Sequence, residues 1–146
     1  MLTAEKNSAR AAEKGAQKIN VGLIGFGTVG TGVAKVLKEN ASVIKDKLGA
    51  EIVLKRIADK DITRDRGVRL DEGVLTTDAK VLLEDPEISI IIELVGGTGI
   101  AKDFIMEALD RGKHVVTANK ALLSTHGKEI FKKAAEKGVD IGFEAS

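Results

Sequence analysis

A run of glycines between an apolar segment and a helical segment is the part of this sequence best suited to binding a ligand. It follows Ile19–Ile24 and comprises Gly25, Gly27, Gly30 and Gly32. In a G-x-G-x-x-G turn, the first glycine makes the tight bend, the second lets a pyrophosphate approach the backbone, and the third lets helix and strand pack closely. The helix N-terminus then offers N–H groups and a positive dipole end to phosphate. We therefore expect Gly25, Gly27 and Gly30 to bind a dinucleotide, with a ligand-free glycine turn as the alternative.

Asp59 is the acidic residue that could bind the adenosine ribose of such a cofactor. It follows a second apolar run, Glu51–Ala58, and a carboxylate there accepts hydrogen bonds from the ribose hydroxyls of NAD. It lies 29 residues after the last glycine of the motif, beyond the usual ~20, so an extended helix and loop must fill the interval. Lys60, Arg64 and Arg66 could instead hold the 2′-phosphate of NADP, or form a solvated charged loop. Because a carboxylate repels that phosphate, Asp59 favours NAD.

Glu93 and two glycines occupy the end of the strongest apolar run, ISIIIELV over 88–95. Ligands of doubly wound sheets bind at the carboxyl ends of the strands, so Glu93, Gly96 and Gly97 should face the cofactor cleft. The alternative for Glu93 is a structural carboxylate that accepts hydrogen bonds from nearby backbone N–H groups.

Thr117, Asn119 and Lys120 lie at the end of the next apolar run, His114–Ala118. This position is again on the ligand side of the sheet. A lysine there can attract a carboxylate substrate as a point charge or, with a shifted pKa, take part in proton transfer. A solvated surface lysine is the alternative.

An alternation of expected strands and helices positions all these residues. Strands are predicted at 19–24, 51–58, 74–76, 88–95, 114–118 and 139–145, with helical patterns between them. Val29, Val33, Val36 and Leu37 are predicted to form the buried face of the first helix. Run 88–95 should be a central strand covered by helices on both faces. The alternation favours an α/β class with a doubly wound, mostly parallel Rossmann sheet, as a single domain over 18–146 after a flexible tail over 1–17.

Composition excludes several classes of function. The 146 residues carry 23 Lys+Arg against 22 Asp+Glu, which gives no electrostatic reason to expect nucleic acid or a membrane as partner. There is no cysteine, so thiolate nucleophiles and cysteine-ligated metals are excluded. No apolar run approaches the ~18–20 residues of a membrane span, and the first residues lack an apolar signal core. A cytoplasmic location is expected.

Three segments together resemble homoserine dehydrogenase: GLIGFGTVGTGV (22–33), VVTANKALL (115–123) and FEAS (143–146). VVTANKALL is the most specific of them, because many unrelated dehydrogenases share the glycine motif. The resemblance implies an oxidoreductase in which NAD or NADP carries hydride between L-homoserine and L-aspartate 4-semialdehyde, in threonine and methionine biosynthesis.

The resemblance also implies roles for individual residues. Phe26, Thr28 and Val29 would line the pyrophosphate turn together with the glycines. Lys120 would bind cofactor and substrate and assist proton transfer. Glu144 would help to hold a monovalent cation.

One position departs from the family pattern and leaves the choice of cofactor open. Lys60 stands where many bacterial members carry an arginine that contacts the 2′-phosphate of NADP. Asp59 replaces the small or apolar residue common just before it. NAD or NADP is therefore expected, with Asp59 favouring NAD.

Members of the family continue beyond this length into a domain that binds the small-molecule substrate and makes most of the dimer interface. The chain is therefore expected to be the cofactor-binding part of a homodimeric enzyme, able to bind NAD(P) but inactive alone, with a monomer as one outcome for the fragment. A free-standing NAD(P)-sensing module is one alternative. Another is a related amino-acid dehydrogenase, against which Asn119 and Lys120 argue.

Overall fold

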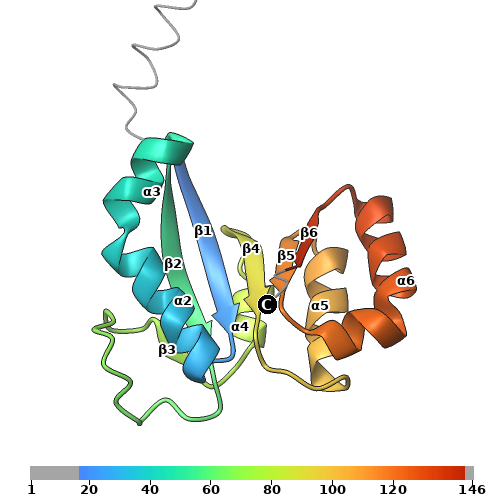
Figure 1. Cartoon of the computed structure of the whole chain (residues 1–146), viewed down its shortest axis with the longest axis horizontal. Coiled ribbons are helices and arrows are strands. Elements are labelled where there is room, and N and C mark those ends of the chain that lie inside the picture. Colours follow the sequence, from blue (N-terminus) through green and yellow to red (C-terminus); the bar gives the residue numbers. More distant parts are fainter. Residues whose placement is uncertain (1–16, 144–146) are drawn as a thin grey trace, which may run out of the picture.

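The computed structural model describes residues 17–143 (Figure 1). The expected tail over 1–17 lies outside them except for Gln17, with which β1 begins. In chain order the elements are β1 (Gln17–Ile24), α2 (Thr28–Glu39), α3 (Ala41–Leu48), β2 (Ala50–Ala58), β3 (Leu75–Thr76), α4 (Lys80–Leu83), β4 (Ile88–Glu93), α5 (Ile100–Asp110), β5 (His114–Thr117), α6 (Lys120–Lys137) and β6 (Ile141–Phe143). Within the same residues, no helix combines the length and the apolar character needed to cross a bilayer.

The described strands form a six-stranded sheet in the order β3-β2-β1-β4-β5-β6, and each neighbouring pair is parallel. This order is typical of Rossmann sheets and confirms the predicted α/β class with a doubly wound parallel sheet. The strands β1, β2 and β3 are added toward one edge of the sheet, and β4, β5 and β6 are added toward the other, so the order reverses between β1 and β4. Loops that diverge from that point leave a crevice at the carboxyl ends of the two strands, where such folds bind their ligands.

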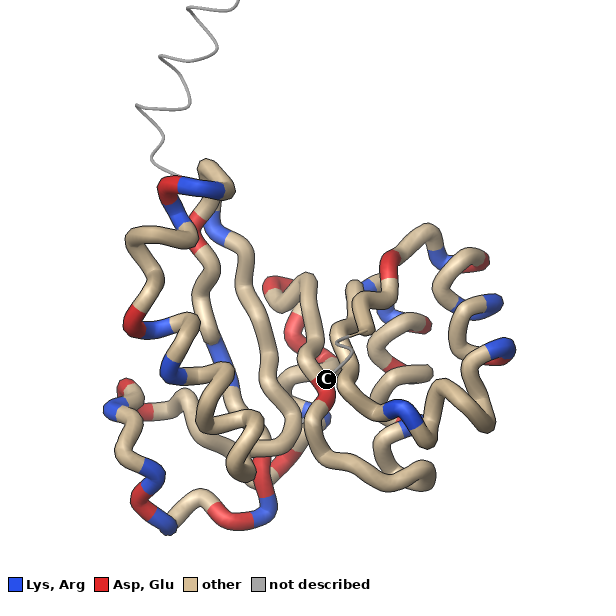
Figure 2. The backbone as a smooth tube through the Cα atoms, viewed as in Figure 1, with Lys and Arg blue, Asp and Glu red and all other residues tan. Residues whose placement is uncertain are grey.

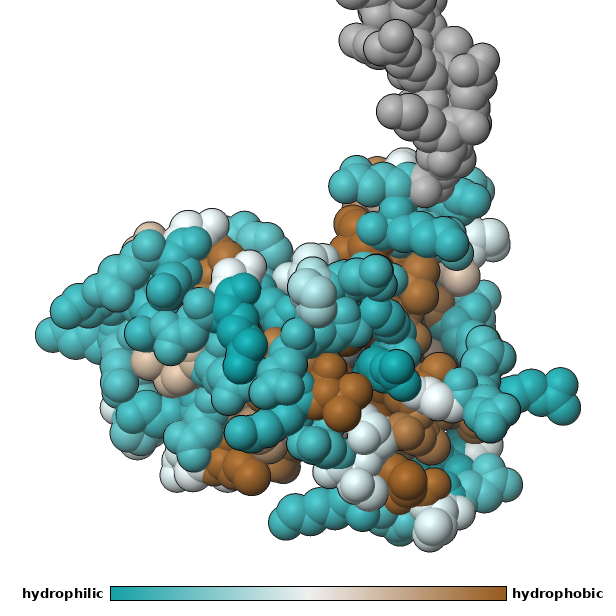
Figure 3. Space-filling model, turned by 180° about the vertical axis from the view of Figure 1, so that it is seen from behind, coloured by the Kyte–Doolittle hydropathy of each residue, from teal (hydrophilic) through white to brown (hydrophobic). Residues whose placement is uncertain are grey.

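The core lies on both faces of the sheet, because successive residues of a strand point to opposite sides. Leu23 and Ile57 pack with Phe26 on the side of α2. Ile24 and Ala58, the next residue in each strand, pack on the side of α4, α5 and α6. In Figure 1, α2 and α3 lie beside β1 and β2, whereas α5 and α6 lie beside β4 to β6. Seen from behind, apolar side chains reach the surface between these two halves (Figure 3).

Helix α2 buries a different face from the one predicted. Gly30 and Ala34 are its buried residues, whereas Val29 is 62% and Val36 is 53% exposed. The prediction that these two valines face the core is wrong. The cause is the approach of the helix to the preceding turn: a Cβ atom at Gly30 would lie 2.1 Å from the carbonyl oxygen of Gly25. The smallest residues therefore face the strand, and Val29 and Val36 turn outward.

Strand β4 is covered less completely than predicted. Ile88 and Ile91 are at most 1% exposed, and α4 and α5 contact the strand. Ile90 and Ile92 are only partly buried, since α2 and α3 pack against β2. The expected cover by helices on both faces is therefore found on one face.

Helix α3 explains the long interval between the glycine motif and Asp59. It was not predicted as a separate helix, although Gly49, which ends it in a left-handed conformation at φ +70°, is a usual stop signal. An additional helix and its connection bring the chain back to the start of β2, so Asp59 still follows the second strand.

Candidate functional site

The glycine turn has the backbone geometry that its sequence predicts. Gly25 adopts φ +104°, and a Cβ atom there would lie 2.8 Å from the backbone of Leu94. Its N–H donates to the carbonyl of Ala58 at 2.8 Å. The tight bend at Gly25 and the close packing at Gly30 are therefore confirmed, and the bend brings the ends of β1, β2 and β4 together.

Gly27 is the glycine of the motif that faces open space. It is exposed, and a Cβ atom there would meet nothing within 4 Å. Gly27 is also the N-cap residue of α2, and within residues 17–143 no side chain caps this helix. Because the first N–H groups of a helix have no partners inside it, the start of α2 presents donors outward, next to the exposed Thr28 and Val29.

Phe26 contributes backbone rather than side chain to this turn. Its ring is 2% exposed and packs with Leu23, Ala34 and Ile57. Its N–H donates to Asp59 Oδ1 at 2.9 Å. The aromatic ring thus anchors the turn in the core.

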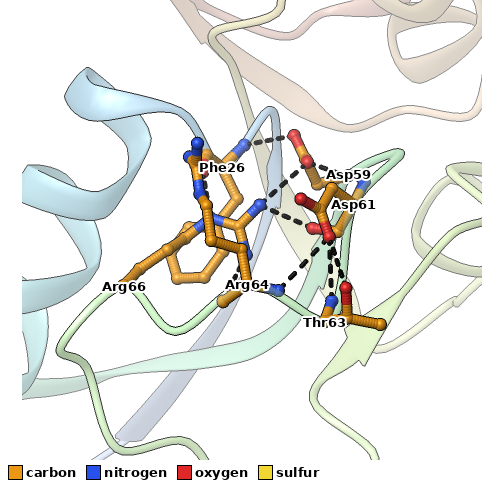
Figure 4. Close-up of polar contacts among 6 residues, drawn as sticks. All are labelled: Phe26, Asp59, Asp61, Thr63, Arg64 and Arg66. Atoms are coloured by element: carbon orange, nitrogen blue, oxygen red, sulfur yellow. Dashed lines mark hydrogen bonds and ion pairs between the residues drawn. The ribbon is translucent and has the colours of Figure 1, made fainter.

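Asp59 is bonded to the glycine turn and to the loop after β2 (Figure 4). Besides Phe26, it accepts the N–H of Asp61 at Oδ2, at 3.0 Å, and pairs there with Arg66 Nη2 at 3.1 Å. The Arg66 side chain is 5% exposed and that of Asp59 is 23% exposed. A merely solvated loop, one of the two alternatives for the basic residues, is therefore wrong for Arg66.

Asp61 shapes the same loop, in which charges of both signs gather (Figure 2). Its Oδ1 accepts hydrogen bonds from the N–H and the hydroxyl of Thr63 and from the N–H of Arg64, at 2.9–3.2 Å. The bonds from Thr63 are the main cause that lowers the pKa of Asp61 below its ordinary value. The loop therefore has a defined conformation that places Arg66 over the turn.

Glu93 accepts hydrogen bonds from backbone N–H groups, as the alternative prediction had it, and it also forms part of the wall of the cleft at the ends of β4 and β5, as the first prediction expected. It is 0% exposed. Its Oε2 accepts the N–H groups of Val95 at 2.8 Å and Gly96 at 3.3 Å, and its Oε1 accepts the Thr117 hydroxyl at 2.7 Å. Gly96 and Gly97, at φ +81° and +76°, allow the loop to bend back over this carboxylate.

Thr117 and Asn119 continue this network to the start of α6. The Thr117 hydroxyl is buried, donates to Glu93 and accepts the N–H of Asn119 at 3.1 Å, so it faces Glu93 rather than the cleft. The Asn119 amide donates to the carbonyl of Gly97, and its Oδ1 caps α6 by accepting the N–H of Leu122 at 3.0 Å.

Lys120 is the first residue of α6 and is exposed. The cap at Asn119 holds its backbone, and its side chain belongs to the wall of a cleft at the end of β4 and β5. A cation at a helix N-terminus opposes the helix dipole, which makes this an electrostatically unfavourable place for a lysine with only a structural role.

Adjoining clefts bring most of the predicted site residues together. A cleft of about 670 Å³ is lined by Gly25, Gly27, Asp59 and Lys60. A shallower one of about 410 Å³ shares Gly27 with it and includes Thr28 and Arg66. A third, of about 280 Å³, shares Leu94 with the first and includes Val29, Gly96, Asn119 and Lys120. Phe26, Gly30, Gly97 and Thr117 do not line these clefts and support the residues that do.

Sequence reasoning missed part of the cleft that contains Asp59 and Lys60. Its walls include Thr77, Asp78, Ala79, Ile100 and Phe104. Thr77, Asp78 and Ala79 follow β3, and Ile100 and Phe104 lie in the first two turns of α5. Their position after a strand of a parallel sheet was the available signal, but none of them belongs to a motif.

The metal prediction is not tested by the described part of the chain. Glu144, the predicted cation ligand, lies outside residues 17–143. Within those residues, no group of three or more His, Asp or Glu side chains could hold a metal ion.

The chain is similar to homoserine dehydrogenases in sequence and in structure. A family model described as "Homoserine dehydrogenase, NAD binding domain" matches residues 25–144. A homoserine dehydrogenase of Bacillus subtilis is 41% identical over 128 residues, which cover 88% of this chain and 30% of the relative. A crystal structure of Staphylococcus aureus homoserine dehydrogenase superposes with a TM-score of 0.83 at 40% identity, covering 89% of this chain and 33% of that one.

A hyperthermophilic archaeal homoserine dehydrogenase, solved in complex with NADPH, superposes with a TM-score of 0.70 at 25% identity and covers 88% of this chain and 44% of that one. The chain thus spans about 30% of the length of the curated relatives it matches.

Proposed function

The chain belongs to the homoserine dehydrogenase family, in which it matches the NAD-binding domain, and we propose that it binds NAD or NADP at the carboxyl ends of β1, β2 and β4. The observation that carries this proposal is the position of Gly27. It is the exposed N-cap residue of α2, where the described residues supply no side-chain cap, and it lines two adjoining clefts. A pyrophosphate at Gly27 would place one end of the cofactor on each side of the crevice between β1 and β4.

The two ends of the cofactor have different surroundings. The adenosine would lie in the larger cleft beside Asp59 and Lys60, between the ends of β2 and β4. The nicotinamide would lie in the cleft beside Val29 and Lys120. When bound, this ring supplies or accepts a hydride.

For the whole protein we propose the interconversion of L-homoserine and L-aspartate 4-semialdehyde. Membership of the family and the segment VVTANKALL, which contains Lys120, support this reaction. Because the chain spans about 30% of its relatives' length, residues beyond these 146 would supply the substrate site. The chain alone would bind cofactor without turnover.

Lys120 would serve this reaction from the start of α6. Asn119 holds it there through the cap on α6 and the bond to Gly97, and Glu93 supports Asn119 through Thr117. At the nicotinamide end of the cleft, an ammonium group can orient a carboxylate or carbonyl substrate and exchange a proton with its oxygen.

The remaining expectations are proposals of the same kind. Glu144 would help to hold a monovalent cation, and the whole protein would be a homodimer. The whole protein would be located in the cytoplasm, and the lack of cysteine supports this location.

Calorimetric titration of the chain with NADH and with NADPH tests the binding proposal. Saturable binding of at least one cofactor is expected, and no binding of either would refute it. Oxidation of L-homoserine by the chain alone would contradict the proposal that turnover needs further residues.

A substitution in the whole protein tests the role of Lys120. Lys120→Met should lower kcat by about 10²- to 10⁴-fold, the usual contribution of a positioned acid or base. Lys128→Met, which removes the same charge from an exposed position of the same helix, should leave kcat unchanged. Equal kcat values for the two variants would show that Lys120 has no role in catalysis.

A further inference from the structure

A closed ring of contacts surrounds the backbone N–H and carbonyl of Phe26 (Figure 4). Asp59 Oδ1 accepts the Phe26 N–H at 2.9 Å, and Arg66 Nε donates to the Phe26 carbonyl oxygen at 2.7 Å. Arg66 Nη2 closes the ring on Asp59 Oδ2 at 3.1 Å. The guanidinium carbon also lies 4.6 Å from the centroid of the Phe26 ring. The ion pair thus holds both polar atoms of the residue between Gly25 and Gly27.

The guanidinium of Arg66 is almost fully used by these contacts. Besides Phe26 and Asp59, it donates from Nη1 to the Arg64 carbonyl at 3.1 Å and from Nη2 to the Asp61 carbonyl at 2.5 Å. Within residues 17–143 these bonds engage four of the five N–H groups that an arginine carries. The side chain is 5% exposed. Arg66 therefore faces the protein, and few of its donors remain for a ligand.

The charge of Asp59 is compensated by the same contact. A carboxylate at the end of β2 disfavours NADP because it repels the 2′-phosphate. Here a guanidinium lies 3.1 Å from one of its oxygens, so a phosphate nearby would meet an ion pair of zero net charge. Lys60, exposed at the rim of the same cleft, adds a positive charge.

We propose that Arg66 determines cofactor specificity indirectly, by compensating the charge of Asp59, so that the adenosine end of the site accepts a 2′-phosphate as well as a 2′-hydroxyl. This inference rests on the proposed function, since it concerns the same cofactor site. It makes Arg66 a positioning residue that acts through Asp59, and it predicts that the effect of losing Arg66 depends on whether residue 59 is charged.

The test compares two adenosine nucleotides that differ only by the 2′-phosphate. The dissociation constants of 5′-AMP and adenosine 2′,5′-bisphosphate are measured by calorimetry for the wild-type chain, Arg66→Met, Asp59→Asn and the double variant. In Arg66→Met, affinity for the bisphosphate relative to AMP should fall by at least about tenfold, because the carboxylate is no longer compensated. In the double variant, the ratio should return to within about threefold of wild type, because the repelling charge is gone.

Further variants keep the test decisive if Arg66→Met does not fold. Asp59→Asn leaves the guanidinium uncompensated and should raise the relative affinity for the bisphosphate. Arg66→Lys keeps the charge and should hold the ratio near wild type. Arg69→Met removes a charge from an exposed position of the same loop and should not alter the ratio.

The outcomes separate the two proposals. If the wild-type chain binds neither nucleotide, the proposed function fails. If it binds them and none of the variants changes the ratio, only the role of Arg66 fails. A double variant as weak toward the bisphosphate as Arg66→Met would show that Arg66 contacts the phosphate directly, and this result would overturn charge compensation.

Discussion

Replacing Gly27 by aspartate should strongly weaken cofactor binding and leave the fold intact. Gly27 has φ −81° and ψ −155°, an extended conformation that any residue adopts. A Cβ atom there meets nothing within 4 Å. An aspartate at this N-cap can accept a hydrogen bond from the first turn of α2, where its charge also complements the helix dipole. The free energy of unfolding should therefore stay constant or rise by up to about 1 kcal/mol.

The same carboxylate would occupy the place proposed for the pyrophosphate. Two like charges about 4 Å apart repel by about 1 kcal/mol in water and by about 4 kcal/mol at an effective dielectric constant of 20. Because Gly27 is exposed, an intermediate cost of about 2–3 kcal/mol is appropriate, which corresponds to roughly 30- to 150-fold weaker binding.

Calorimetry with NADH or NADPH and urea unfolding measure the two effects on the same variant. Ala41→Asp is the matched control, since it adds the same charge at the exposed start of α3. Its affinity should stay within about twofold of wild type, because salt screens a charge outside the cleft. A Gly27→Asp chain that unfolds cooperatively and still binds with wild-type affinity would refute the placement of the pyrophosphate at α2.

Other substitutions probe the supports of the site. Gly30→Ala should prevent stable folding, because the new Cβ would lie 2.1 Å from the Gly25 carbonyl oxygen; circular dichroism checks this, and a native spectrum with unchanged unfolding would contradict it. Glu93→Gln should lower the free energy of unfolding by about 1–3 kcal/mol, since an amide N–H₂ cannot accept the buried hydrogen bonds that the carboxylate receives; urea unfolding measures the loss. At Asp85, burial alone raises the pKa, but hydrogen bonds led by that from Lys55 outweigh it and lower the pKa below 3.8. Its contribution to stability is thus complete above pH 3.8 and is lost as the pH falls through the lowered pKa. In Asp85→Asn, the free energy of unfolding should decrease less steeply as the pH falls from about 6 to about 2. An unchanged slope would exclude the contact of Asp85 with Lys55 as the cause of the decrease.

Local patterns sufficed to predict the glycine turn and the order of the strands, although helix α3 was not predicted. Gly25 needs its positive φ because of the bend that it makes, and the alternation of apolar runs and helical periods predicts a parallel sheet. The position of the candidate site at the strand ends was predicted from the same order, because parallel strands place all their carboxyl ends at one edge of the sheet. These features depend on residues close together in the sequence, so a single sequence contains their signal.

The rotation of α2 and the surroundings of the charged residues were decided by contacts between distant segments. Val29 and Val36 of α2 turn outward because the backbone of Gly30 lies against Gly25. Arg66 is 40 residues from Phe26 and becomes a buried partner of the glycine turn only when the loop after β2 folds over it. The sequence by itself determined that the glycine turn, Asp59 and Lys120 lie at the carboxyl edge of the sheet. Only the tertiary structure decided which charges there are compensated, since burial and ion pairing depend on the neighbours that folding brings within a few ångströms.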